Sequence, residues 1–276
     1  LAEPGNLSPL AEVVAAANGL RLETDFKATL AAAARLGGLW HQVDKLEGRE
    51  PREPRPAPAP LPPPVVEPPR EWPPKDEVDA LWSSCTLTSE SPEVDAYLRA
   101  RSLNPDLVDG RELARALPET GALPRWAVCQ GGTWRDAGYK LVIPMYDATG
   151  EMRAVRVGRV VDGDGPKRRP PFGHKAGELA MADVLGRAML RGEFKPYRIS
   201  IVEGEPDFLS RASVMNDPHG CTLGIVSGSW TKSFAERVPL GGRVYVRTDV
   251  DAAGDRYAKE IEDSLRRRAF IWRLQA

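Results

Sequence analysis

The chain has 276 residues, of which 42% are hydrophobic and 28% are charged, and its formal net charge is −1. This composition is ordinary for a globular protein with one large or two modest domains, and it excludes a strongly basic chain that binds nucleic acid through its overall charge. No apolar run approaches the ~20 residues of a bilayer-spanning helix. We therefore expect a cytoplasmic protein without membrane contact.

The cysteine content argues against cross-links and zinc. Cys85, Cys129 and Cys221 form no closely spaced pair, and their odd number does not fit a disulfide framework. A zinc ribbon needs paired clusters of four Cys or His ligands, which the three histidines do not supply, so we expect no zinc site within this chain. Because the chain begins with Leu1 and lacks a signal-like segment, we expect an excised fragment.

The N-terminal part predicts helices followed by a spacer. Apolar residues recur at helical spacing from Leu7 to Leu39, which predicts two short helices, the second of which ends at Gly37-Gly38. Pro51 to Pro74 contains twelve prolines, which lack the backbone N–H donor and have a fixed φ. This segment should be an extended linker between two units, either a plain tether or a docking motif.

From Asp76 to Leu117 the spacing of apolar residues is helical again. The apolar run 141–146, the turn Asp147-Ala-Thr-Gly150 and the alternating run 152–161 then predict a strand, a turn and a second strand. Between Glu151 and Ser200 the chain has eleven Lys or Arg against six Asp or Glu, so this region is locally basic by five charges.

Strand-like and helix-like runs alternate from Tyr197 onward, which predicts βα units around a parallel sheet. The expected strands and the helices between them are Arg198–Val202, Asp207–Met215, Thr222–Ser227, Thr231–Val238, Arg243–Thr248, Ala252–Arg268 and Ala269–Leu274.

Acidic residues follow the first and third of these strands. Glu203 ends the first strand and Asp207 starts the next helix, while Asp249 and Asp251 end the third strand on one face. Ligand sites in open α/β sheets lie at the carboxyl ends of the strands. If the two strands are neighbours, the four acids form one anionic pocket.

Such a pocket stays ionised only when cations compensate its charge, and oxygen-only ligands favour Mg²⁺ or Mn²⁺. Magnesium is commonly shared with substrate phosphates, which suits phosphoryl transfer. Gly204 and Gly254 would let the backbone approach this pocket closely. The alternative interpretation is that Asp207 and Asp251 only cap the first turns of helices.

Together, the E-G-x-x-D run at Glu203 and the D-x-D-x-x-G run at Asp249 resemble the Toprim signature, which primases, topoisomerases and OLD-type nucleases share. The run Leu141–Gly150 resembles the strand and hairpin of a primase N-terminal subdomain, and Val94–Leu103 a helix that precedes it. The chain is therefore similar to the catalytic core of DnaG-type primases of bacteria, phages and plasmids.

This resemblance implies an α/β Toprim domain with a four-stranded, mainly parallel sheet flanked by helices (197–276). A mixed α+β primase subdomain (76–196), the linker (51–75) and a helical segment like the tail of a zinc-binding module (1–50) would precede it. It implies template-directed synthesis of RNA primers on single-stranded DNA from nucleoside triphosphates, with two Mg²⁺ or Mn²⁺ ions and a replicative helicase as a further partner. A metal-dependent nuclease and a non-catalytic DNA-binding module stay open.

The resemblance also implies roles for individual residues. Glu203, Asp249 and Asp251 correspond to the catalytic acids, Asp207 is a further metal ligand, and Gly228 belongs to the small-residue turn after the second strand. Phe172, Trp134 and Trp230 either stack on bases or, as we expect, pack in the core. Seven basic residues are expected to hold the template and the triphosphates: Arg153, Arg156, Arg159, Lys167, Arg168, Arg169 and Lys175.

Overall fold

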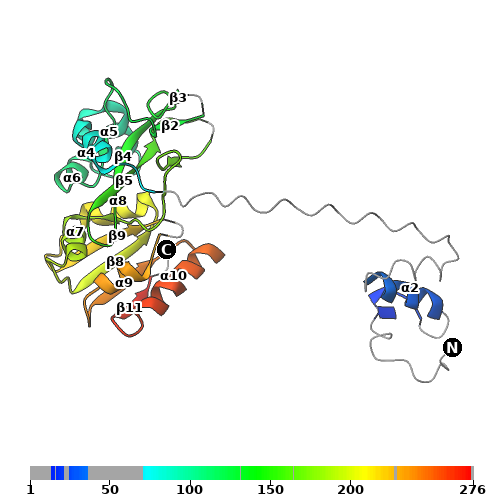
Figure 1. Cartoon of the computed structure of the whole chain (residues 1–276). Helices are drawn as coiled ribbons and strands as arrows, with labels where there is room; N and C mark the ends of the chain where they lie inside the picture. Colours follow the sequence, from blue (N-terminus) through cyan, green and yellow to red (C-terminus); the bar gives the residue numbers. More distant parts are fainter. Residues whose placement is uncertain are drawn as a thin grey trace. The chain divides into compact units, whose positions relative to one another are not determined.

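The computed structural model describes residues 14–15, 17–21, 25–36, 71–130, 132–163, 165–226 and 229–274. The chain forms two compact units, Leu1–Val66 and Glu67–Ala276 (Figure 1). In the first unit the second expected helix is confirmed as α2 (Phe26–Leu36), whereas most of the other expected helix lies outside the described residues. In the described parts of the chain, no helix has the length and apolar character to span a membrane.

The second unit begins with short helices, as the sequence predicts. The helix α6 starts at Pro105, because the Asn104 side chain accepts a hydrogen bond from the Asp106 N–H and Pro105 occupies the first helical turn. The elements of this part are α4 (Lys75–Ser84), the 3₁₀ helix η1 (Thr88–Glu90), α5 (Pro92–Arg99) and α6 (Pro105–Gly110).

An antiparallel sheet follows, in the strand order β1-β4-β5-β6. The expected strand, turn and strand are confirmed as β4 and β5, and the Asp147 carboxylate fixes the turn by accepting the Thr149 N–H at 2.8 Å and the Glu151 N–H at 3.2 Å. The strands are β1 (Arg115–Ala116), β4 (Tyr139–Tyr146), β5 (Met152–Arg159) and β6 (Arg168–Arg169), with a separate small hairpin of β2 (Val128–Cys129) and β3 (Gly132–Thr133).

The second sheet has the order β11-β10-β8-β9-β7. Its four expected strands, β8 to β11, are all parallel, and β7 adds an antiparallel edge. The sequence did not predict β7 because two residues are too few for a periodic pattern. The elements are β7 (Met181–Ala182), α7 (Val184–Arg191), β8 (Arg198–Glu203), α8 (Glu205–Val214), β9 (Gly220–Ile225), α9 (Lys232–Arg237), β10 (Arg243–Arg247), α10 (Ala252–Leu265) and β11 (Phe270–Arg273).

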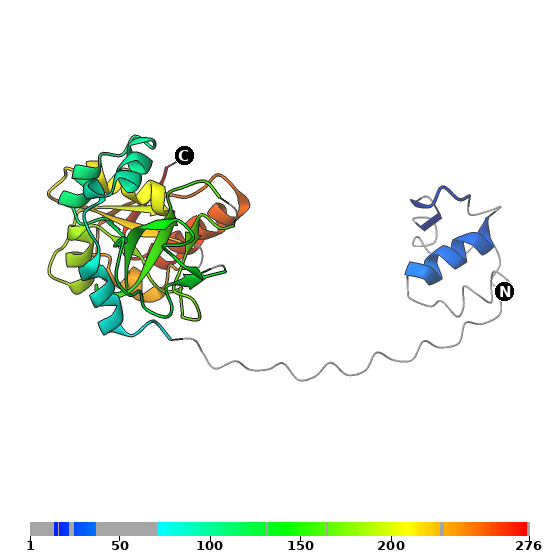
Figure 2. The ribbon, with the colours of Figure 1, turned by 90° about the horizontal axis from the view of Figure 1, so that it is seen from above.

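The parallel sheet has a hydrophobic core on each face. On one face Ile201 and Val246 pack in a cluster with Phe234 of α9 and Ile261 of α10. On the other face, side chains of β8 and α8 share a second cluster with β4 of the antiparallel sheet. Figures 1 and 2 both show the green β4–β5 hairpin against the yellow part of the chain that carries α8 and β9. The two sheets therefore share a core.

Gly254 fixes the loop between β10 and α10. A Cβ atom at this position would overlap the carbonyl oxygen of Asp249 and would lie 2.9 Å from its carbonyl carbon. Real Cβ atoms do not approach backbone atoms so closely, so only glycine lets the first turn of α10 pack on this loop. Gly254 thereby sets where Asp249 and Asp251 leave the sheet.

Gly254→Ala should lower the free energy of unfolding by about 2 kcal/mol or more, because the added methyl group must displace the Asp249 backbone. Gly110→Ala is the matched control, since no atom lies within 4 Å of its Cβ position and its φ is not positive. Urea unfolding monitored by circular dichroism measures both variants. Equal stability of the two would contradict the close packing at Gly254.

Candidate metal and nucleotide site

The four predicted acidic residues lie at one edge of the parallel sheet. β8 and β10 are direct neighbours, with Val202 paired to Arg247, so both strands deliver their next residues to the same edge. The backbone N–H of Asp249 donates a hydrogen bond to Glu203 Oε2 at 3.1 Å. The condition on which the predicted site depended, that Glu203 lies beside the Asp249 and Asp251 segment, is met.

The negative charges at this edge of the sheet repel one another. Partial burial raises the pKa of Glu203, the hydrogen bond from the Asp249 N–H lowers it, and the negative charges of Asp249, Asp251 and Asp207 raise it further, with a net upward shift. All three aspartates are thus within electrostatic reach of Glu203. A divalent cation would relieve this repulsion.

Two of the acids also have local partners. One carboxylate oxygen of Asp251 accepts the N–H groups of Ala253 and Gly254 at 2.8 and 2.7 Å, so Asp251 is the N-cap of α10 as the alternative interpretation proposed. Asp207 lies 3.7 Å from Arg247 in an exposed ion pair and does not cap α8. Capping uses Oδ1 of Asp251 and leaves Oδ2 available to a ligand.

The donor chemistry fits magnesium or manganese, because the site offers carboxylate oxygens and neither His nor Cys. The side chains are not closed around an ion position, however. Among the residues that the structure describes, no group of three or more His, Cys, Asp or Glu side chains is arranged to hold a metal. Metal binding would require carboxylates at this edge to turn toward a common point.

Gly204 is the residue between β8 and α8. Its φ is +83° and its ψ is 158°, a conformation that is strained for residues with a side chain. It reverses the chain between Glu203 and the buried Glu205. Gly228, the third predicted glycine, lies outside the described residues.

Glu205 forms a buried ion-pair contact between the two sheets that could not be predicted from the sequence. Its side chain is 8% exposed and pairs with Arg156 of β5 at 2.7 Å and with Arg168 of β6 at 3.8 Å. Arg168 also donates to the Tyr97 hydroxyl at 2.9 Å. Arg156 and Arg168 therefore join the basic hairpin, which we define as β5, β6 and the residues between them (152–169), to the first turn of α8. Contact of these two arginines with nucleic acid would compete with the ion pairs.

The other predicted basic residues are more accessible and have mixed partners. Arg153 pairs with Asp147 at 2.6 Å, and Lys175 with Glu178 at 2.7 Å. Arg169 donates to the Tyr139 hydroxyl, Arg159 donates to the Gly163 and Gly165 carbonyls, and Lys167 is exposed. Their proposed contacts with template and triphosphates stay predictions.

The three aromatic residues that the sequence singled out have different environments. Trp134 is fully buried, and Trp230 stacks on Phe234 with ring centroids 5.9 Å apart, so the expected core packing is confirmed for Trp134. For Phe172 it is wrong, because this side chain is 68% exposed. Phe172 lies outside the strands and helices, between Pro170-Pro171 and Gly173. It lines a hollow with Arg169 and Lys175.

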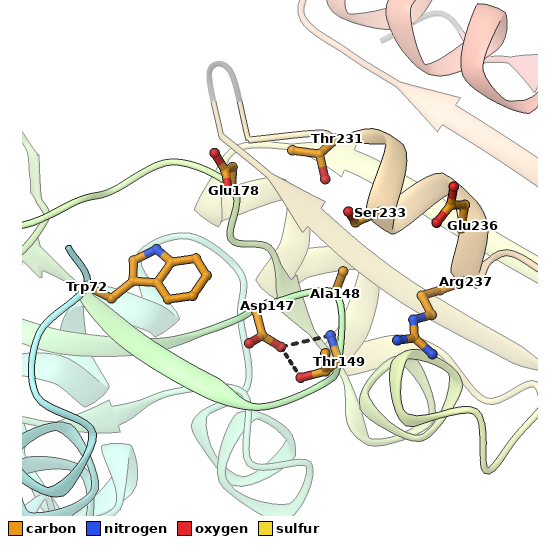
Figure 3. A pocket seen from close by; sticks show the side chains of 9 residues that line it. All are labelled: Trp72, Asp147, Ala148, Thr149, Glu178, Thr231, Ser233, Glu236 and Arg237. Atoms are coloured by element: carbon orange, nitrogen blue, oxygen red, sulfur yellow. Dashed lines mark hydrogen bonds between the residues drawn. The ribbon is translucent and has the colours of Figure 1, made fainter. Parts of the chain in front are cut away.

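A further hollow of about 450 Å³ lies beside the β4–β5 turn (Figure 3). Asp147 points into this region, and its hydrogen bonds to Thr149 hold the turn. None of the four predicted acids lines this hollow. Its lining residues are Trp72, Asp147, Ala148, Thr149, Glu178, Thr231, Ser233, Glu236 and Arg237.

The chain shares its fold with solved primase structures. No protein-family model and no curated protein matches it. A DnaG catalytic core has 16% identity and a TM-score of 0.50, with 73% of this chain and 72% of that chain covered. A DnaG primase catalytic domain bound to single-stranded DNA has 17% identity and a TM-score of 0.51, with 72% of this chain and 72% of that chain covered. The E. coli primase catalytic core has 16% identity and a TM-score of 0.50, with the same coverage of both chains. The second unit therefore has the fold of a DnaG primase catalytic core.

Arg156→Met should lower the free energy of unfolding by about 2 kcal/mol, because it leaves the buried Glu205 carboxylate with only the more distant Arg168. Arg99→Met is the control, since Arg99 makes an exposed ion pair with Asp95 and its removal should leave the thermal midpoint nearly unchanged. Differential scanning calorimetry compares the two. An Arg156→Met midpoint equal to that of the wild type would show that the ion pair does not stabilise the fold.

Proposed function

We propose that this protein is a DNA primase that makes short RNA primers on single-stranded DNA, with divalent cations held by Glu203, Asp207, Asp249 and Asp251. The observation that carries the proposal is the hydrogen bond from the Asp249 N–H to Glu203, which joins the two acidic motifs at one edge of the sheet. The likeness in fold to primase catalytic cores, one of them bound to single-stranded DNA, supports it.

In the proposed reaction a primer 3′ hydroxyl attacks the α-phosphate of a nucleoside triphosphate, and pyrophosphate leaves. Bound Mg²⁺ or Mn²⁺ would supply Lewis-acid stabilisation of the attacking and leaving oxygens. Glu203 and Asp249 would each contribute a carboxylate, and the hydrogen bond from the Asp249 N–H to the Glu203 carboxylate holds the Glu203 side chain beside the loop that carries Asp249. Asp251 would act through the carboxylate oxygen that does not cap α10.

The basic hairpin supplies the complementary charge in this proposal. Arg169 lies in β6, Lys167 directly precedes this strand and Lys175 lies in the loop that follows it, so they can offer charge to phosphates. Arg156 and Arg168 have a different role, since their ion pairs with Glu205 position the first turn of α8 directly after Glu203. The acids and the basic residues thus come from the two sheets that share a core.

Primer synthesis from a single-stranded template, Mg²⁺ and labelled ribonucleoside triphosphates tests the proposal. The wild type should extend new oligonucleotides, and Glu203→Gln or Asp249→Asn should reduce the rate about 100-fold or more, because each removes a carboxylate from the cation site. Glu260→Gln on the exposed side of α10 should retain wild-type activity.

The same assay separates the other outcomes. Shortened template with no new oligonucleotide would instead identify a metal-dependent nuclease. Primer synthesis that persists in Asp249→Asn, with the variant folded by circular dichroism, would contradict the assignment of this edge as the catalytic site.

A further inference from the structure

The face of the parallel sheet that carries α8 is only partly covered. Alternate residues of β10 point to this face, and Arg243 and Arg247 on it are exposed, whereas Val244 and Val246 between them are buried on the opposite face. The register pairs Arg243 with Phe270 and Tyr245 with Trp272 of β11. α8 packs over β8 and β9, and among residues 71–274 that the structure describes no helix packs over the β10 and β11 half of this face.

A groove of about 510 Å³ lies where α8 meets this open half. β8 and β10 form its floor and α8 forms one wall. The polar and aromatic side chains that line it are Arg198, Ser200, Asp207, Ser210, Arg211, Tyr245 and Arg247.

Aromatic side chains of β10 and β11 lie next to the groove. The rings of Tyr245 and Trp272 are stacked, with centroids 5.3 Å apart and an interplanar angle of 20°. Phe270 lies 6.4 Å from Trp272, and 64% of Phe270 and 42% of Trp272 are exposed. Large aromatic side chains with this exposure, side by side on a sheet, offer stacking surfaces to a planar ligand.

The charge of this face is positive. Two of its four arginines have an acidic partner: Arg198 pairs with Asp217 at 2.9 Å, and Arg247 pairs with Asp207 at 3.7 Å. The other two are Arg211 and Arg243. In the described part of the chain no carboxylate lies within ion-pair distance of Arg211 or Arg243. Arg211 donates to the Ser200 hydroxyl at 3.2 Å, and the Arg243 guanidinium lies 4.8 Å from the centre of the Tyr197 ring.

We propose that this face, made by the groove and by Arg243, Tyr245, Phe270 and Trp272, binds single-stranded nucleic acid. Its arginines would contact phosphates while bases stack on the exposed rings, which is the combination that unpaired strands require. A polyanion with planar bases matches the surface better than an apolar helix does, because the large side chains are aromatic and are interleaved with arginines.

Asp207 links this face to the candidate metal site. It lines the groove and is also one of the acids whose charge raises the pKa of Glu203. A strand bound in the groove would therefore lead to the edge of the sheet where the acids gather. The inference concerns binding alone and does not require that the protein synthesises primers.

The test is fluorescence anisotropy of a labelled oligothymidylate with the full chain in EDTA, so that metal-dependent chemistry does not contribute. The variant Arg211→Gln/Arg243→Gln should bind about 10-fold more weakly at low salt and should have a smaller salt dependence, because two phosphate contacts are lost. Trp272→Ala should weaken binding about 5-fold or more at every salt concentration through lost stacking.

Lys259→Gln/Arg267→Gln is the matched control, since it removes two exposed charges, one from α10 and one from the turn after it, and α10 packs on the other face of the sheet. If the control and the Arg211→Gln/Arg243→Gln variant lose affinity equally, the proposal is wrong. Ultraviolet cross-linking locates the strand independently: adducts on the peptides that carry Tyr245 or Trp272 support the proposal, and adducts confined to the 167–175 segment overturn it. A dimer that Trp272→Ala dissociates, without oligothymidylate binding, would identify this face as a contact between two copies and also overturn it.

Discussion

The parallel pairing of β8 with β10 is the interaction on which the candidate site depends. It brings Glu203 and the Asp249–Asp251 segment to one edge, although forty-five residues separate Glu203 from Asp249 along the chain. Partial burial of Glu203, and to a lesser extent the negative charges of the three aspartates, raise the pKa of Glu203, so its ionised form is unfavourable in the absence of a cation. The rest of the fold maintains this arrangement through the close packing of Gly254, the positive φ of Gly204 and the ion pairs of Glu205 with the antiparallel sheet.

Much of this arrangement could be predicted from the sequence. The four parallel strands and their helices have strong periodic patterns, and the E-G-x-x-D and D-x-D-x-x-G runs mark the ends of β8 and β10. The strand, turn and strand around Asp147 were equally clear. These features are local, because each depends on residues that are close together in the chain. The prediction that the two acidic runs lie together required one further assumption, that β8 and β10 are neighbours in the sheet. The structure confirms this pairing.

The features that could not be predicted are contacts between distant segments. Arg156 and Arg168 had the pattern of solvent-exposed phosphate ligands, but both pair with the buried Glu205 of α8. No sequence rule distinguishes Glu205 from its acidic neighbours, because its burial results from packing between the two sheets. The exposure of Phe172 is likewise set by packing between distant segments. On β10 the arginines and Tyr245 alternate with buried valines, but only the register with β11 places them beside Phe270 and Trp272 on one face.

The central claim is that the carboxylates at this edge are a divalent cation site. Anomalous diffraction from crystals of the protein soaked in Mn²⁺ tests it most directly, because manganese substitutes for magnesium at oxygen ligands and its position is located without reference to activity. The account predicts anomalous density bounded by Glu203, Asp249 and Asp251, which is lost in Asp249→Asn crystals soaked in the same way. Ordered manganese elsewhere on the protein, with none at this edge in the wild type, would contradict it.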